Sequence, residues 1–271
     1  MPELPEVETI KKQVQEVLPL KVTTVEYSSV SDSIVKTKDF DPTGMTLKNI
    51  DRQGKVLRLY FSDDCRVISG LGMSGSWRIS STYITEKHTH VQFIGKSNGK
   101  KFFLGYIDPR RFGNIHFFNK ENEKTWLKRL GPDVGAPEFN ADYLWELRGS
   151  KPTKVLKSFM LDQGYFAGMG NYMASEVCAR AFIRPTRKMG MLTRKDCENL
   201  IGATRSVLED SISNNGTTFS GGYLDANGEK GEGVKNLLVF YQKQCGICKK
   251  TEVKKITLGG RGTYYCPKCQ K

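Results

Sequence analysis

Two C-x-x-C pairs near the end of the chain constrain its fold more than any other feature of the sequence. They are Cys245 with Cys248 in CGIC and Cys266 with Cys269 in CPKC, and seventeen residues separate them. Four cysteines at this spacing can converge on one tetrahedral zinc ion, and a closed four-cysteine site is structural. Two disulfides or a redox pair are the alternatives, but the first twenty residues do not have the pattern of a secretory signal, which argues against disulfides. We expect one Zn²⁺ ion that folds a short β-hairpin with Arg261 near its tip.

The net charge points to a polyanionic partner. Lys and Arg (42) exceed Asp and Glu (29) by 13, and residues 241–271 hold eight of these basic residues against Glu252 alone. Neutralising phosphates releases counterions, so such an excess favours nucleic acid, although a solubilising tail is the alternative. No apolar run approaches the roughly 20 residues that cross a bilayer. We expect no membrane partner, and because the sequence carries no oligomerisation signal we expect a monomer.

Hydrophobic periodicity predicts an α+β chain of several parts. Residues 5–18 have helical spacing, with Pro5 at the first helical position and Pro19 after the end. Between residues 20 and 120 the pattern becomes short strands rich in β-branched and aromatic residues, such as VLRLYF, HVQFIG, KFFLGYID and NIHFF. A succession of short strands is typical of a β-sandwich or barrel.

Residues 121–215 are predicted to be helical, and a glycine-rich segment follows. Thr193 and Asp196 have the spacing of a capping box variant at the start of the last long helix. Residues 216–236 have many glycines and almost no period, which predicts a long flexible loop, and such loops are often functional.

The N-terminus, MPELPEVETI, has the residue types of a nucleophilic site. Once the initiator Met is removed, Pro2 presents a secondary amine whose pKa of about 7.7–8.0 leaves a useful fraction unprotonated. Such an amine can form a Schiff base, here a cationic iminium, and Glu3 beside it can act as a general acid/base. Taken alone, the pattern is better explained by an efficiently processed second residue, so the rest of the sequence must decide.

Six motifs occur in the order found in one enzyme family: PELPEVET, GMSG, DPRRFG, LGPD, LDQ…AGMGN and GRGTYYCPKCQ. Across residues 2–270 the chain resembles the formamidopyrimidine-DNA glycosylases, which have a helix–two-turn–helix. The resemblance implies an N-terminal β-sandwich catalytic domain at 1–135, a helical DNA-binding domain at 136–236 with a lesion-covering loop at 217–235, and a zinc finger at 237–271.

The resemblance also implies an activity. Such enzymes of base excision repair excise 8-oxoguanine and formamidopyrimidines from duplex DNA, cut the strand at abasic sites by β,δ-elimination, and belong to the bacterial cytoplasm, associated with the nucleoid. By similarity, Pro2 attacks C1′ of the damaged nucleoside, Glu3 transfers protons, and Glu6 organises the lesion pocket. Lys55 would contact the lesion phosphates, for which a solvated turn lysine is the alternative.

The remaining implied residues bind DNA. A base must leave the helix before its sugar can be attacked. Met73 would fill the vacated space, Phe112 would wedge between base steps, and Arg111 would pair with the orphaned cytosine. Asn171 and Arg261 would grip the backbone. Core packing for Met73 and Phe112, and a surface charge for Arg111, are the plain alternatives.

The chain departs from the family pattern at three places. Members commonly have His where this chain has Gly70, GNYMASE leans toward the endonuclease VIII branch, and VFYQKQC is shorter than the usual segment before the finger. An endonuclease VIII-like enzyme for oxidised pyrimidines and a non-catalytic zinc-ribbon DNA-binding protein are therefore the alternative functions.

Overall fold

The computed structural model describes residues 2–220 and 222–271, which form two compact units. The first comprises the chain up to Arg129 together with Ile212–Val234, and the second comprises Leu130–Ser211 together with Lys235–Lys271. This division differs from the expected boundaries at 135 and 236, because the glycine-rich loop returns to the β-rich unit and the cysteine-rich end packs with the helices.

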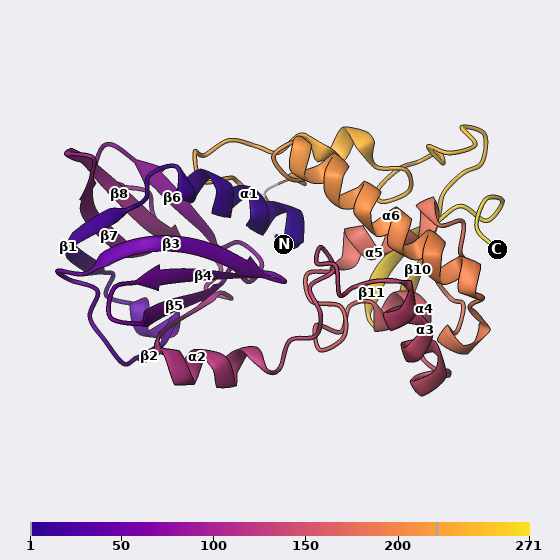
Figure 1. The fold of residues 1–271 in the computed structure, drawn as a ribbon. Helices are drawn as coiled ribbons and strands as arrows, with labels where there is room; N and C mark the ends of the chain where they lie inside the picture. The colour runs from indigo at the N-terminus through magenta and orange to yellow at the C-terminus, as the bar shows by residue number, and fades with distance from the viewer. Residues whose placement is uncertain (1, 221) are drawn as a thin grey trace. The chain divides into compact units, whose positions relative to one another are not determined.

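The first unit is built on one antiparallel-rich sheet of nine strands (Figure 1). Its order is β2-β9-β5-β4-β3-β1-β7-β8-β6. The strands are β1 (Leu20–Tyr27), β2 (Val35–Lys38), β3 (Thr46–Gln53), β4 (Val56–Phe61), β5 (Cys65–Gly70), β6 (Ser76–Ser80), β7 (Thr89–Ser97), β8 (Lys100–Ile107) and β9 (Asn114–Asn119).

Aromatic contacts show that the sheet folds over its own core. Phe93 on β7 stacks against Trp77 on β6 with ring centroids 5.5 Å apart. The same ring meets Phe61 on β4 at 5.7 Å and Phe117 on β9 at 6.4 Å, although β4 and β9 are not neighbours of β7 in the sheet. All four rings are buried, so the two halves of the sheet share one apolar interior.

Helix α1 (Leu4–Gln15) buries its apolar side against this core through Val7, Ile10 and Val14. The predicted span of 5–18 extends about one turn beyond the observed end at Gln15, because the helix stops before it reaches Pro19. A short 3-10 helix η1 (Ser31–Ser33) and helix α2 (Lys120–Leu127) complete the unit.

The second unit is mainly helical. It contains α3 (Ala141–Ser150), α4 (Leu156–Phe159), α5 (Asn171–Arg180), the 3-10 helix η2 (Met189–Met191), the second half of the 3-10 helix η3 (Gly233–Asn236) and most of α6 (Arg194–Ser213). The capping box predicted for α6 is confirmed, because Asp196 accepts from the Thr193 N–H at 2.8 Å and the Asp196 N–H donates to the Thr193 hydroxyl at 3.1 Å.

The cysteine-rich end forms the predicted hairpin. Strands β10 (Lys254–Leu258) and β11 (Arg261–Tyr265) pair in antiparallel register, and Gly259 and Gly260 turn between them at positive φ. Glycine suits this turn because two successive residues have left-handed backbones. The expected α+β class, with a β domain, a helical domain and a terminal hairpin, is confirmed. None of the helices within residues 2–220 and 222–271 is both long and apolar enough to span a bilayer.

Candidate active site and nucleic-acid interface

The start of α1 holds the candidate catalytic residues. Pro2, Glu3 and Glu6 are buried, and Glu3 is the N-cap of the helix. The Glu6 carboxylate accepts a hydrogen bond from the Glu3 N–H at 2.7 Å and a second from the Thr217 N–H at 2.8 Å. One carboxylate therefore fixes both the N-terminal end of the chain and the beginning of the glycine-rich loop, 211 residues away in sequence.

Gly216 lets the loop approach Glu6 closely. Its φ is +86°, and a Cβ atom there would lie 2.9 Å from the Tyr223 ring and 3.0 Å from Glu6 Cγ. A side chain at this position would force Glu6 or Tyr223 to move. Burial, followed by the nearby charge of Glu6, raises the pKa of Tyr223 far above its ordinary value, so the phenol stays neutral.

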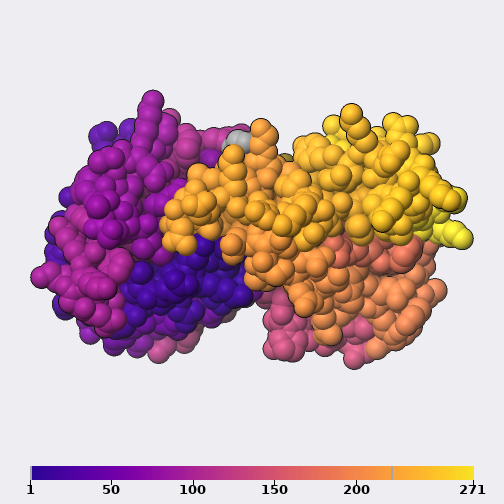
Figure 2. Space-filling view, turned by 90° about the horizontal axis from the view of Figure 1, so that it is seen from above, coloured from indigo at the N-terminus to yellow at the C-terminus, as the bar shows by residue number. Residues whose placement is uncertain are grey.

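Much of the loop is fixed to the first unit, in contrast to the predicted flexibility. The buried carboxylate of Asp225 accepts from Gln13 Nε2 at 2.6 Å and from the Asn227 and Glu229 N–H groups. Gln13 Oε1 in turn accepts from the Ala226 N–H at 2.8 Å. In the space-filling view the orange loop lies over the indigo N-terminal residues (Figure 2). Buried side chains, which a glycine count does not reveal, supply this anchorage.

The loop also forms a pocket of about 440 Å³. Thr218 at its wall accepts from the Gly231 N–H at 2.8 Å and donates to the Tyr223 carbonyl at 2.9 Å, which closes the loop on itself. The pocket is lined by Thr218, Phe219, Ser220, Gly222, Leu224 and Lys230. Its size and its polar groups are suitable for a nucleobase.

Lys55 lies in the two-residue turn between β3 and β4. Arg52 links this turn to α1, because its Nη1 donates to the Gly54 carbonyl at 3.0 Å and its Nε donates to Glu8 at 2.8 Å. Burial pushes the pKa of Glu8 upward, but hydrogen bonds from Lys11 and Arg52 hold it below its ordinary value. The position of Lys55 is thus tied to the helix that directly follows Pro2 and Glu3.

Met73, Arg111 and Phe112 lie on two turns that are packed backbone to backbone. The first turn spans 71–75 and the second 108–113. A Cβ atom on Gly72 would lie 2.4 Å from the Phe112 carbonyl carbon, and one on Gly113 would lie 2.8 Å from the Gly70 oxygen. Only glycine permits this contact, so the two turns behave as one rigid tip.

The tip presents its side chains to solvent. Phe112 is 57% exposed, Arg111 is exposed with a left-handed φ of +55°, and Met73 is half-buried. An exposed aromatic ring and a strained cationic residue at the end of a rigid turn are poor core elements. The alternative interpretation of Phe112 as a core residue is therefore not favoured. Met73 is half-buried, so its burial does not decide between a core residue and a DNA-binding one.

In the second unit, Asn171 and the finger hairpin lie together. Asn171 is the first residue of α5, and its Nδ2 donates to the Gly262 carbonyl at 3.0 Å, next to Arg261. Its Oδ1 accepts from Lys157, which is completely buried. Lys157 was missed by the sequence analysis, although a lone lysine inside the apolar run VLKSF is a recognisable signal.

The four paired cysteines meet at one point. Their sulfur atoms all lie within 4.8 Å of one another, with 3.9 Å between Cys245 and Cys269 and 4.0 Å between Cys248 and Cys266. Zinc–sulfur bonds of about 2.3 Å in a tetrahedron place sulfurs roughly 3.8 Å apart. The residues therefore fit one structural zinc ion.

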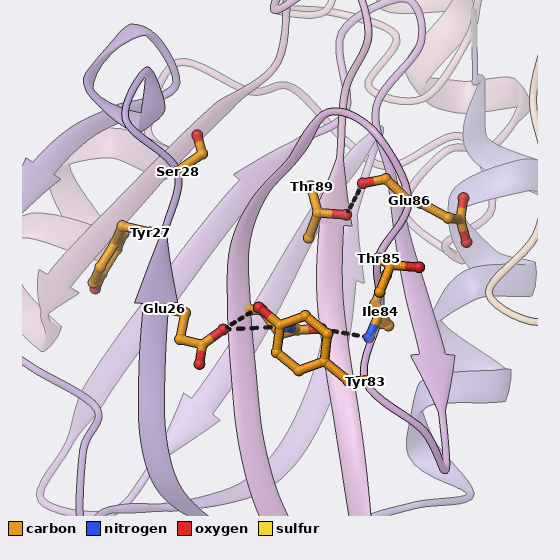
Figure 3. Close-up of a pocket in the computed structure, with 9 residues that line it drawn as sticks. Glu26, Tyr27, Ser28, Tyr83, Ile84, Thr85, Glu86 and Thr89 are labelled. Atoms are coloured by element: carbon orange, nitrogen blue, oxygen red, sulfur yellow. Dashed lines mark hydrogen bonds between the residues drawn. The ribbon is translucent and has the colours of Figure 1, made fainter.

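A separate pocket of about 360 Å³ lies beside β1 and β7 (Figure 3). Its Glu26 carboxylate already accepts from the Tyr83 hydroxyl at 2.6 Å, and Glu86 pairs with Arg78 at 3.3 Å. Its acidic groups are satisfied within the unit and do not suit a polyanion, so we do not assign it to the candidate site.

Three family models match successive parts of the chain. They are described as the formamidopyrimidine-DNA glycosylase N-terminal domain (residues 1–115), the formamidopyrimidine-DNA glycosylase H2TH domain (130–221), and the zinc finger found in FPG and IleRS (243–271).

Individual relatives match over the full length. The formamidopyrimidine-DNA glycosylase of Listeria innocua is 33% identical over 281 residues, covering 100% of both chains. The Lactococcus lactis Fpg solved with abasic-site DNA is 29% identical, with a TM-score of 0.87 and 100% of both chains covered. A MutM structure with DNA containing carbocyclic 8-oxo-G is also 29% identical over 100% of both chains, with a TM-score of 0.86.

Proposed function

The chain belongs to the formamidopyrimidine-DNA glycosylase family, and from this premise we propose that it removes oxidised purines from duplex DNA by means of Pro2. It is a DNA glycosylase and AP lyase of base excision repair. The substrates that we propose are 8-oxoguanine and formamidopyrimidines, followed by strand cleavage through β,δ-elimination. We place this activity in the bacterial cytoplasm, at the nucleoid.

One observation carries the proposal: the Glu6 carboxylate joins the Glu3 N–H to the Thr217 N–H. Because of this bridge, the end of the chain that bears the amine and the loop that bears the 440 Å³ pocket are hydrogen-bonded to one another within the first unit. A nucleophile and a base-binding pocket must be held together if a flipped nucleoside is to be attacked at its sugar.

The chemistry follows from the secondary amine of Pro2. Its lone pair bonds to C1′ as the bond from C1′ to the base breaks, and the departing base takes a proton. The Pro2 nitrogen then loses its proton and the C1′–O4′ bond breaks as O4′ takes a proton, which opens the sugar ring and leaves a cationic iminium. The iminium withdraws electrons, so that loss of a C2′ proton expels the 3′ phosphate, and loss of a C4′ proton then expels the 5′ phosphate. Glu3 is suited to move the protons of sugar-ring opening, because it is adjacent to Pro2 and is held at the N-cap of α1.

The rigid tip would maintain the opened duplex. Phe112 is proposed to wedge between base steps, Met73 to fill the space of the flipped nucleotide, and Arg111 to donate to the orphaned cytosine. Lys55 would bind the phosphates of the lesion strand. Asn171 and Arg261 would hold the DNA backbone, and their mutual link through Gly262 supports a joint role.

Borohydride trapping on an 8-oxoguanine duplex tests the proposal. The mature protein, checked by mass to begin at Pro2, should form a covalent adduct that Pro2→Gly abolishes. Pro137→Ala, an exposed proline of the second unit, is the matched control and should trap normally. Duplex binding without any adduct in the wild type would instead support the non-catalytic DNA-binding alternative.

Further variants and substrates separate the remaining alternatives. Glu3→Gln should retain DNA affinity and lose turnover, whereas a collapse of affinity would make Glu3 structural. Arg111→Ala should reduce discrimination of the base opposite the lesion. Faster excision of thymine glycol than of 8-oxoguanine would replace the purine assignment with the endonuclease VIII-like one.

A further inference from the structure

Asn114 occupies the space that a side chain at position 70 would need. The two residues are directly opposite each other in the pairing of β5 with β9. A Cβ atom on Gly70 would lie 3.0 Å from Asn114 Oδ1 and 3.1 Å from its Nδ2. The amide of Asn114 therefore lies across the face of Gly70.

This amide is not satisfied by the protein. Asn114 is half-buried, and its Oδ1 is buried without a hydrogen-bond partner among residues 2–220 and 222–271. Exchanging the two amide atoms by a flip would leave the N–H₂ group unsatisfied in the same position. A buried amide atom without a partner is costly, and native proteins rarely keep one without a reason.

The amide lies in a row with the other candidate DNA-binding groups. Val56, Gly70 and Asn114 are register partners across β4, β5 and β9, so they lie side by side. Lys55 directly precedes Val56, and Phe112 is two residues before Asn114. Asn114 therefore stands between the turn that carries a proposed phosphate-binding cation and the tip that carries the proposed wedge.

We propose that Gly70 and Asn114 form a phosphate subsite in which Asn114 Nδ2 donates a hydrogen bond to a non-bridging oxygen of the lesion strand beside Lys55. Oδ1 is the buried atom of the amide, which leaves Nδ2 as the outward donor. Gly70 leaves the amide in place, because a Cβ atom there would push it away by a few tenths of an ångström. This subsite rests on the proposed function and adds a phosphate contact to it.

The affinity of the zinc-loaded full chain for a tetrahydrofuran-containing duplex tests the subsite. Asn114→Ala should weaken binding about tenfold. Its thermal unfolding midpoint should not fall, because an unsatisfied amide has been removed. Asn114→Asp should weaken binding further, since a carboxylate then faces a phosphate. Asn98→Asp makes the same charge change in the β7–β8 turn, at a φ of +49° that Asp tolerates, and should bind like the wild type.

Two additional measurements distinguish a phosphate contact from a structural role. Gly70→Ala should weaken binding when Asn114 is present and have no further effect in Asn114→Ala, because its only action is to displace the amide. Asn114→Ser, which keeps a donor, should recover part of the lost affinity. The dependence of log K on log salt should be unchanged in Asn114→Ala, since a neutral donor releases no counterion.

The subsite would be overturned if Asn114→Ala bound within twofold of the wild type, or if Asn114→Asp merely matched Asn98→Asp. Additive effects of the Gly70 and Asn114 changes would also overturn it. Borohydride trapping at saturating protein separates this failure from failure of the proposed function. An adduct in the wild type leaves the enzyme activity intact whatever the binding data for the variants show, whereas no adduct in the wild type removes the activity itself.

Discussion

The hydroxyl of Ser74 donates a hydrogen bond of 2.6 Å to the carboxylate of Asp108, and this bond joins the two turns that form the exposed tip. Asp108 is fully buried, and its other oxygen accepts from the Gly113 N–H at 2.8 Å. The backbone carbonyl of the same residue lies 3.1 Å from the buried His90 ring. Asp108 is itself buried, but its hydrogen bonds hold in place the two turns that carry Met73 and Arg111.

Asp108→Asn should loosen the tip without abolishing catalysis. The amide keeps one acceptor oxygen, so either the Gly113 N–H faces an N–H₂ group and loses its acceptor, or the Ser74 hydroxyl must turn to accept from that group instead of donating. Loss of a buried hydrogen bond typically costs about 1–3 kcal/mol. We expect weaker discrimination of the base opposite the lesion, measured as the ratio of excision rates opposite cytosine and adenine. Ser74→Ala, which removes one bond only, should have a smaller effect in the same direction. An unchanged ratio in Asp108→Asn would contradict this role.

Removal of zinc should affect the two units differently. Without the metal the four cysteines no longer hold the β10–β11 hairpin, and the bond from Asn171 to Gly262 is lost with it. We expect duplex binding to be abolished by a chelator or by Cys266→Ser. In a Trp145→Phe background the remaining tryptophans, Trp77 and Trp126, belong to the first unit. Their fluorescence should stay native, and unfolding of both units together would refute the prediction.

Periodicity and spacing predicted those parts of the fold that depend on local sequence. The predicted strand VLRLYF has the same first and last residues as β4, because apolar and polar side chains largely alternate along it. The Thr193–Asp196 capping box and the convergence of the four cysteines depend on residue types at short, fixed spacings, and both were found. Strand β3 was missed because TLKNIDRQ has only two buried apolar positions among polar ones.

Contacts between distant segments could not be predicted in this way. Nothing near Glu6 indicates that it accepts from Thr217, and nothing in the glycine-rich loop indicates that Asp225 is anchored by Gln13. Only the resemblance of the motifs to a known family predicted that the N-terminus, the tip and the loop belong to one functional site. The orphaned amide of Asn114 depends on cross-strand register, which sequence patterns do not specify.

Lys96 should destabilise the sheet in which it lies. Its direct cross-strand partners are Lys21 on β1 and Lys101 on β8, and all three side chains are exposed. Opposed like charges are unfavourable by roughly 0.2–1 kcal/mol for each pair. Lys96→Thr should therefore raise the free energy of unfolding by about 1 kcal/mol in urea titrations at low salt, and 1 M salt should shrink the gain. Lys100→Thr, whose partner is Ser97, should change little; equal gains from both variants would exclude charge repulsion.

Stability should fall as the pH drops below neutrality because of two histidines. Burial lowers the pKa of His90 and of His116 below the ordinary 6.5, so both rings are neutral in the folded and unfolded states above that value. As the pH falls through 6.5, the unfolded chain binds protons first, and stability is lost progressively until the folded pKa values are reached. Each ring contributes at most about 1.4 kcal/mol per pH unit.

Urea midpoints at pH 7.5, 6.5 and 5.5 should fall steadily in the wild type and less steeply in His90→Gln/His116→Gln. An equal slope in the double variant would show that other groups govern the acid sensitivity.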